Sequence, residues 1–202
     1  SIVGLTAGVR PNVDLARGTT LAVGRGLLVD RSLRTNVANV FAAGDCAELV
    51  RPGERNLVQQ VWYTGKQQGE CVGRVIAGEV CEHEPGIWFN SAKLLDLEYQ
   101  TYGTVLPSPQ PGETRLWWER PDNHGEIGLR IVVRDDAVTG FNALGLRLRH
   151  RVCERWIQER ASPLHVLAHL EDAHFDPELF RRHEPEIVSA LSAQLDLTRS
   201  LA

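Results

Sequence analysis

Short apolar runs separated by turn residues dominate the first part of the chain. They predict three brief strands: a buried one within residues 1–11 that ends in a turn, a second at residues 26–30 and a third at residues 37–43. The third run is almost continuously apolar, which is typical of a strand that is covered on both faces. Residues 13–21 fit either a short helix or a loop.

A longer segment at residues 57–78 has a helical pattern with glycine at every fourth position. Gly65, Gly69 and Gly73 would lie along one face of this helix and leave that face without side chains. Each glycine in a helix interior costs about 1 kcal/mol relative to alanine. We therefore expect this face to approach another backbone segment or a flat cofactor closely.

The pattern changes near residues 81–85, and we place a domain boundary between residues 82 and 83. Beyond it, strand-like alternation comes first and helical spacing follows. Strands are predicted at residues 94–102, 114–119, 127–134 and 137–144, the last two joined by a turn at Asp135-Asp136. Helices are predicted at residues 148–159 and after the start signals Ser162-Pro163 and Asp176-Pro177. Antiparallel strands followed by helices are typical of an α+β domain.

Composition narrows the functional classes. The 202 residues carry 22 basic and 26 acidic side chains, a net charge of −4, which gives no electrostatic reason to expect nucleic acid or membrane binding. No apolar run approaches the roughly 20 residues that span a bilayer, and we expect a cytoplasmic protein. Because the chain contains no methionine, we expect it to be processed or to be a piece of a longer protein. Its four cysteines, which form no C-x-x-C pair, are expected to be reduced structural thiols.

The strongest chemical signal lies at the end of the third apolar run, where residues 40–45 read Val-Phe-Ala-Ala-Gly-Asp. Gly44 leaves room for a ligand near the backbone, and the Asp45 carboxylate can accept hydrogen bonds from sugar hydroxyls. Taken alone, such a Gly-Asp pair is more often an ordinary turn. Three further blocks precede it in order, Gly-Val-Arg-Pro-Asn at residues 8–12, Gly-Arg-Gly-Leu-Leu-Val-Asp at residues 24–30 and Leu-Arg-Thr at residues 33–35.

Together these blocks closely resemble the end of the FAD domain in the FAD-dependent pyridine nucleotide-disulfide oxidoreductases. That family includes NADH-dependent nitrite reductase, rubredoxin reductase, NADH oxidase and coenzyme A disulfide reductase. The resemblance covers residues 8–48 and continues more loosely to residue 78. It implies an α/β remnant of an FAD-binding domain at residues 1–82 and an α+β interface domain at residues 83–202. In the family, this second domain closes over the flavin and often forms the dimer contact.

The resemblance also implies roles for individual residues. Asp45 would bind the ribityl chain of FAD, with Gly44 giving it room. The helix that starts near Val58, Gln59 and Gln60 would face the flavin ring with its N-terminal amides, which favour negative charge. For Trp62, stacking near the ring and packing in the core are both open. No catalytic residue and no metal ligand is identified.

The chain departs from the family pattern in one respect that limits its function. No G-x-G-x-x-G sequence follows a strand, so neither the phosphate site for FAD nor the NAD(P)H site is expected here. The leading hypothesis is the C-terminal portion of an FAD-dependent NAD(P)H oxidoreductase, inactive by itself, with FAD and a second copy of residues 83–202 as partners. The alternative is a non-catalytic dimerisation or partner-binding module that does not hold FAD by itself.

Two other features allow more than one interpretation. Trp117 and Trp118 on one strand would point to opposite faces, and one ring is open to contact with a partner or with the first domain. His165 and His169 have the spacing of a metal-binding pair, but no third ligand is placed nearby, and a solvated helix face is favoured.

Overall fold

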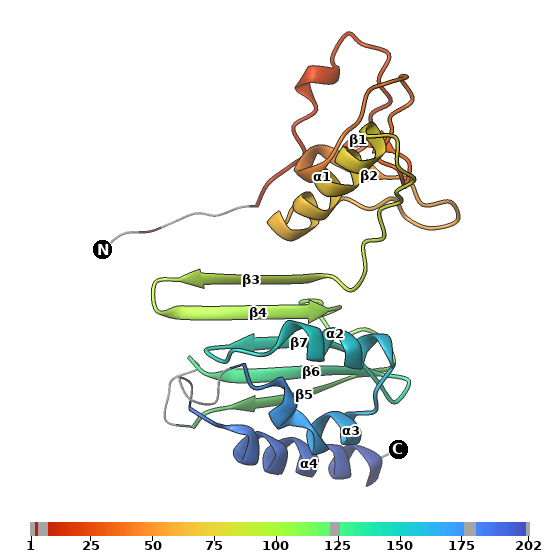
Figure 1. Cartoon of the computed structure of the whole chain (residues 1–202). Coiled ribbons are helices and arrows are strands. Elements are labelled where there is room, and N and C mark those ends of the chain that lie inside the picture. Colours follow the sequence, from red (N-terminus) through yellow and green to blue (C-terminus); the bar gives the residue numbers. More distant parts are fainter. Residues whose placement is uncertain (1–2, 4–7, 122–125, 176–180, 201–202) are drawn as a thin grey trace. The chain divides into compact units, whose positions relative to one another are not determined.

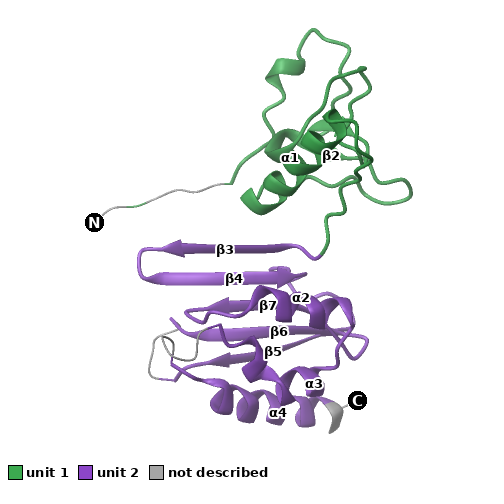
Figure 2. Cartoon of the chain, viewed as in Figure 1, with its two compact units in different colours: residues 1–86 green, residues 87–202 purple. Residues whose placement is uncertain are grey.

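The chain divides between Gly86 and Ile87 in a computed structural model, which describes residues 3, 8–121, 126–175 and 181–200 (Figure 1). Unit 1 comprises Ser1–Gly86 and unit 2 comprises Ile87–Ala202 (Figure 2). The sequence placed its domain boundary slightly earlier, between residues 82 and 83.

Unit 1 is built from short elements around a small core. Its two strands pair in parallel, with Leu27 opposite Ala47 and Val29 opposite Leu49. The elements are η1 (Asp14–Ala16), β1 (Leu27–Val29), η2 (Gly44–Cys46), β2 (Ala47–Leu49) and α1 (Trp62–Ile76). The buried residues of its core cluster are Val29, Leu33, Ala42, Ala47, Leu49, Cys71 and Val75.

The strand predicted at residues 26–30 is present as β1, but the one predicted at residues 37–43 is wrong. There the chain turns back on itself, because the amide of Thr35 donates to the carbonyl of Val40 at 3.0 Å and Asn39 has a φ of 62°. The strand follows the Gly-Asp pair instead, as β2. Most of the strand predicted within residues 1–11 lies outside the described residues, and residues 8–11 have no regular structure.

Helix α1 begins later than the sequence pattern indicated, at Trp62. Leu57 forms backbone hydrogen bonds in both directions with Leu49, at 2.9 and 3.0 Å, and this bridge keeps the preceding segment extended. The predicted close approach of the glycine face holds for Gly65, where an added Cβ would lie 3.5 Å from the Cα of Gly44. At Gly69 and Gly73 an added Cβ would meet nothing within 4 Å.

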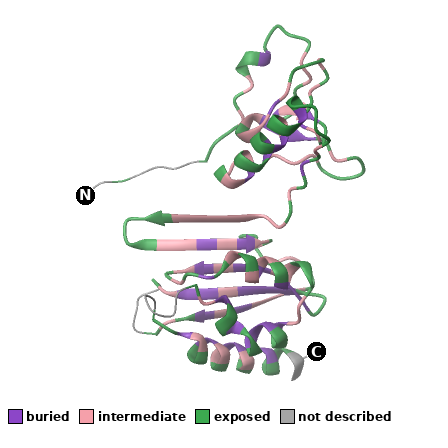
Figure 3. Cartoon of the chain, in the orientation of Figure 1, coloured by how far each residue is buried: buried purple, intermediate pink, exposed green. Residues whose placement is uncertain are grey.

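Unit 2 is an α+β structure with a five-stranded antiparallel sheet in the order β3-β4-β7-β6-β5. The helices pack on one face of this sheet, and the buried residues concentrate between the two layers (Figure 3). The strands are β3 (Phe89–Leu94), β4 (Leu97–Gly103), β5 (Glu113–Glu119), β6 (Gly128–Arg134) and β7 (Ala137–Leu144). The helices are α2 (His150–Gln158), α3 (Pro163–Ala168), η3 (Leu170–Ala173) and α4 (Glu184–Ser200).

Most predictions for this unit are confirmed. The hairpin β6–β7 turns at Asp135 and Asp136, whose φ angles are 52° and 54°. The hydroxyl of Ser162 accepts a hydrogen bond from the amide of His165 at 3.2 Å and caps α3. The single strand predicted at residues 94–102 is instead the turn and second strand of the hairpin β3–β4, because Leu95 has a φ of 54°. The helix start predicted at Asp176 lies outside the described residues.

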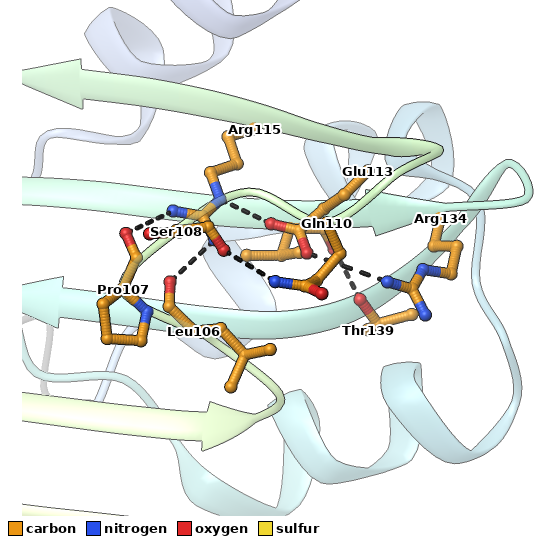
Figure 4. A network of polar contacts seen from close by, with 9 residues as sticks. Leu106, Pro107, Ser108, Gln110, Glu113, Arg115, Arg134 and Thr139 are labelled. Atoms are coloured by element: carbon orange, nitrogen blue, oxygen red, sulfur yellow. Dashed lines mark hydrogen bonds and ion pairs between the residues drawn. The ribbon is translucent and has the colours of Figure 1, made fainter.

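The segment at residues 104–112 connects β4 to β5 by crossing β7 and β6 on the face of the sheet opposite the helices. An added Cβ at Gly140 would lie 2.5 Å from the carbonyl oxygen of Thr104, which places this segment against β7. The guanidinium of Arg115 donates to the carbonyls of Leu106 and Pro107 and pairs with the buried carboxylate of Glu113 (Figure 4). These bonds hold the crossing segment on the sheet.

Candidate functional site

The segment around the Gly-Asp pair is fixed from one side by the Gly-Arg-Gly motif at residues 24–26. The carboxylate of Glu48 is 5% exposed and accepts a hydrogen bond from the amide of Gly26 at 2.8 Å. An added Cβ at Gly24 would lie 2.6 Å from this carboxylate, and one at Gly26 would lie 2.7 Å from the carbonyl oxygen of Cys46. Gly26 therefore requires glycine, because an added Cβ would meet backbone, whereas at Gly24 the Glu48 side chain would have to shift.

Helix α1 fixes the same segment from the other side. The amide of Gly44, which has a φ of 78°, donates to the side-chain oxygen of Gln68 at 2.6 Å. Gln68 is 4% exposed, so this bond lies in a region with little competing water. Asp45 is exposed next to it, and its carboxylate makes no hydrogen bond or ion pair with any described residue. The turn is held firmly, and it presents a free carboxylate.

Gln68 is a positioning residue that the sequence analysis missed. The sequence showed only that a glutamine follows Gly65 within a Gly-Lys-Gln-Gln-Gly segment. The signal that points to it is its spacing, because residues three positions apart on a helix share a face. Gly65 lies against Gly44, so the side chain at Gln68 is placed within reach of the same turn.

Val58, Gln59 and Gln60, predicted as the start of the helix, precede it in non-helical chain. Their expected place in the first helical turn is therefore wrong, for the reason given by the Leu49–Leu57 bridge. Two buried amide atoms in this segment, Oε1 of Gln59 and Nε2 of Gln60, have no hydrogen-bond partner. Unpaired buried polar atoms are costly, so this segment has the capacity to bind a polar ligand.

The N-terminus of α1 has no capping side chain, and no acidic residue occupies its first turn. Its first amides consequently retain hydrogen-bonding capacity and a partial positive charge. Trp62 is 72% exposed and meets the ring of Tyr63 edge-on, with 5.5 Å between ring centroids. Packing of Trp62 in the core is thereby ruled out.

A hollow of about 550 Å³ lies in unit 1 beside Gln60. Its other described lining residues are residues 9–14, Arg17 and Arg25. Arg17 pairs with Asp14 at 2.8 Å, and Arg10 and Arg25 add two further positive charges. The hollow suits a polar ligand that carries negative charge. Gln60 is the one predicted site residue that lines it in the described part of the chain.

Two of the four cysteines have a thiol pKa that burial raises. All four are free thiols. Burial raises the pKa of the Cys71 thiol to about 11, and the adjacent thiol of Cys81 adds to this effect. Burial also raises the pKa of Cys153. Within the described residues, no group of three or more metal-ligating side chains is found; His165 and His169 stack with 4.3 Å between ring centroids.

The comparison with solved structures defines the class of fold. The NAD-dependent persulfide reductase from A. fulgidus superimposes on 96% of this chain and 38% of its own with a TM-score of 0.67, at 19% identity. The two units thus share the fold of the matching part of that protein. Among the described residues, no helix is both long and apolar enough to cross a membrane.

Sequence comparison points to one family. Residues 1–69 of the 202 match the family model described as pyridine nucleotide-disulphide oxidoreductase, and this match supports membership of that family. The assimilatory nitrate reductase electron transfer subunit of Bacillus subtilis is 23% identical over 161 residues, 79% of this chain. Rhodocoxin reductase of Rhodococcus erythropolis is 36% identical over 89 residues, 44% of this chain. The chain spans about a fifth of the length of each, 20% in both cases.

Proposed function

We propose that this chain is the C-terminal portion of an FAD-dependent NAD(P)H oxidoreductase. In this proposal unit 1 supplies the side of the FAD site that meets the ribityl chain and the isoalloxazine ring, and unit 2 is an interface domain that pairs with a second copy. The observation that carries the proposal is the turn at Gly44 and Asp45, which Gln68 holds against α1 while the Asp45 carboxylate is left exposed.

The residues present fit a flavin. The Asp45 carboxylate would accept hydrogen bonds from ribityl hydroxyls, as carboxylates do with ribose. The unpaired amides of Gln59 and Gln60 and the uncapped start of α1 offer donors and acceptors for the polar edge of the ring. When bound, FAD would supply the capacity to accept a hydride from NAD(P)H and to pass electrons to an acceptor.

The contribution of the protein is then positioning and electrostatics. Gln68 orients the backbone of Gly44, which in turn sets the direction of Asp45. The first turn of α1 carries about half a positive charge, which would favour negative charge on a flavin bound there. A cytoplasmic location belongs to this proposal, because the proposed electron carriers are soluble cofactors.

The second candidate function is a dimerisation or partner-binding module without FAD. The sequence feature that favours it is the lack of a G-x-G-x-x-G phosphate-binding loop in the 202 residues. Under this alternative, unit 2 mediates assembly and the exposed carboxylate of Asp45 has no ligand.

A titration followed by ¹H–¹⁵N NMR separates the two. The proposal assigns the chain only the ribityl and ring side of FAD, so riboflavin should bind saturably and shift the amides of residues 44–46 and 58–64. ADP, which has the phosphates without the flavin, should not shift them. Asp45→Ala should weaken riboflavin binding about tenfold, the loss of roughly one charged hydrogen bond.

Glu70→Ala provides the matched control, because Glu70 is an exposed carboxylate on α1 that pairs only with Lys66, at 3.7 Å. It should leave riboflavin binding unchanged. Equal shifts with ADP, or no shift with riboflavin, would contradict the proposal. If the chain sediments as a dimer and its amides do not shift with riboflavin, the dimerisation or partner-binding module is the correct alternative.

A further inference from the structure

Unit 2 contains a cavity of about 210 Å³ that the proposed flavin site does not use. It lies at one end of the sheet. Four parts of unit 2 line it: β6, residues 145–148 after β7, the helix η3, and the start of α4. Its walls are apolar and come from Ile127, Leu129, Leu146, Leu148, Leu170 and Ile187. For scale, an apolar cavity of about 150 Å³ holds a benzene molecule.

Charged side chains surround this apolar space. Those that line it are Arg120, Arg147, Arg181, His174, His183 and Glu184. The charge of Arg147 is already matched, because its guanidinium lies 3.4 Å from a carboxylate oxygen of Glu98 and 4.3 Å from the ring centroid of Phe175. Glu184 is matched too, because it bonds the ring of His174. Arg181 adds positive charge to the lining, and so does Arg120, which has an interaction of its own within the protein.

His183 supplies an unused hydrogen-bonding atom. The residue is 3% exposed, and its Nδ1 is buried without a hydrogen-bond partner. A carboxylate oxygen of Glu186 lies 3.6 Å away, which is too far for a hydrogen bond. The His183 ring also lies near the ring of Trp118, with 5.6 Å between ring centroids.

A second hollow, of about 330 Å³, adjoins the same cations. Trp118, Pro121 and Glu186 line it together with Arg120 and Arg181. The two arginines therefore separate an apolar cavity from a more open space. This is the arrangement expected where a ligand enters with its apolar part first and keeps its charged end at the mouth.

We propose that this cavity binds a small organic anion with an apolar body, of the class of medium-chain monocarboxylates. The apolar body would lie against the leucine and isoleucine walls. The carboxylate would face Arg120 and Arg181 and accept a hydrogen bond from Nδ1 of His183. The site lies entirely within unit 2 and stands independently of FAD binding in unit 1.

Octanoate is the probe for the test, in ¹H–¹⁵N NMR titrations of the 202-residue chain. It should bind saturably and shift the amides of residues 145–148, 170–174 and 183–187. Acetate, which lacks the long alkyl chain, tests whether an apolar body is needed. 1-Octanol, which lacks the carboxylate, tests whether the negative charge is needed. Each should bind at least about tenfold more weakly than octanoate, since each loses one of the two interactions.

The double variant Arg120→Gln/Arg181→Gln should weaken octanoate binding about tenfold, and His183→Phe should weaken it about threefold while keeping an aromatic ring beside Trp118. Arg155→Gln is the matched control, because Arg155 is an exposed arginine on α2 outside the cavity lining. The proposal is overturned if octanoate does not saturate, if its shifts map elsewhere, or if 1-octanol binds as tightly. It is also overturned if the double variant and Arg155→Gln behave alike while both retain the amide spectrum of the folded chain.

Discussion

The two units differ in the size of their buried core and in how many recognisable sequence motifs they carry. Among the described residues, unit 2 buries nineteen apolar residues in one cluster between a five-stranded sheet and its helices. The core cluster of unit 1 contains seven buried residues, around two strands of three residues each. Yet unit 1 carries the specific sequence blocks and the family match, whereas unit 2 carries almost no recognisable motif.

This difference separates two kinds of sequence constraint. In unit 2 the apolar pattern determines the fold, because burial of many side chains stabilises a sheet without any one residue being required. In unit 1 individual residues determine the backbone path, through close contacts such as those of Gly26 and the single hydrogen bond from Gly44 to Gln68. Substitutions should therefore destabilise the two units for different reasons, through lost burial in unit 2 and through disturbed individual contacts in unit 1.

The largest effect is expected in the core of unit 2. Trp156 is 1% exposed, and its ring packs against Phe141 with 6.0 Å between centroids. Trp156→Ala should lower the free energy of unfolding of unit 2 by about 3–5 kcal/mol, because it removes a large buried ring and leaves a cavity. Residue-resolved hydrogen exchange measures this loss separately for each unit. Equal loss of protection in unit 1 would show that the two units do not unfold independently.

An intermediate effect is expected from one added methyl group in unit 1. Gly26→Ala places a Cβ 2.7 Å from the carbonyl oxygen of Cys46, so the parallel pairing of β1 and β2 must shift. We expect a loss of about 1–3 kcal/mol, the usual cost of overpacking. Hydrogen exchange at residues 27–29 and 47–49 should report it.

Gly69→Ala on α1 is the matched control for this substitution. Nothing lies within 4 Å of the added methyl group, and alanine favours a helix interior over glycine by about 1 kcal/mol, so α1 should gain stability. If Gly69→Ala destabilised unit 1 as much as Gly26→Ala does, the glycine face of α1 would be covered in solution.

The sequence predicted unit 2 better than unit 1, and the comparison explains why. Alternation along residues 127–144 was enough to predict the hairpin β6–β7, since its two strands are neighbours in sequence and share one core. The turn at Leu95 was missed because a leucine at positive φ gives no turn signal. The apolar run at residues 37–43 caused the opposite error, because a strand was predicted where the chain forms a turn. Its composition suits a strand, but Thr35 and Asn39 turn the backbone there.

For the candidate site, the sequence identified the turn that carries the site but not the residues that hold this turn in place. The Gly44–Asp45 turn was recognised as a block, but nothing in the periodicity showed that Gln68 holds it. The delayed start of α1 followed from a bridge between Leu49 and Leu57, a tertiary contact that local propensity does not contain. Individual contacts of this kind determine the backbone path of unit 1, and the periodicity of the sequence does not encode them.

The smallest expected effect is on acid stability, and it compares the units directly. Each contains a histidine whose pKa is lowered mainly by burial, His83 in unit 1 and His150 in unit 2. For His150, Arg151 lowers the pKa further, and Glu154 opposes this. A lowered pKa means that the folded state binds the proton less readily than the unfolded state, whose value is near 6.5. The contribution of each neutral histidine to the free energy of unfolding is therefore fully present above pH 6.5. It is lost as the pH falls through 6.5 toward the pKa of the folded state.

His83→Gln should flatten this acid dependence in unit 1 alone, and His150→Gln should flatten it in unit 2 alone. The measurement is the free energy of opening from hydrogen exchange between pH 5 and 7.5, resolved for amides of each unit. Because unit 1 has the smaller core, the same protonation should open it first. If His150→Gln removed more of the acid sensitivity of unit 1 than His83→Gln does, the units would be energetically coupled. The stability of unit 1 would then depend on the core of unit 2 and not only on its own contacts.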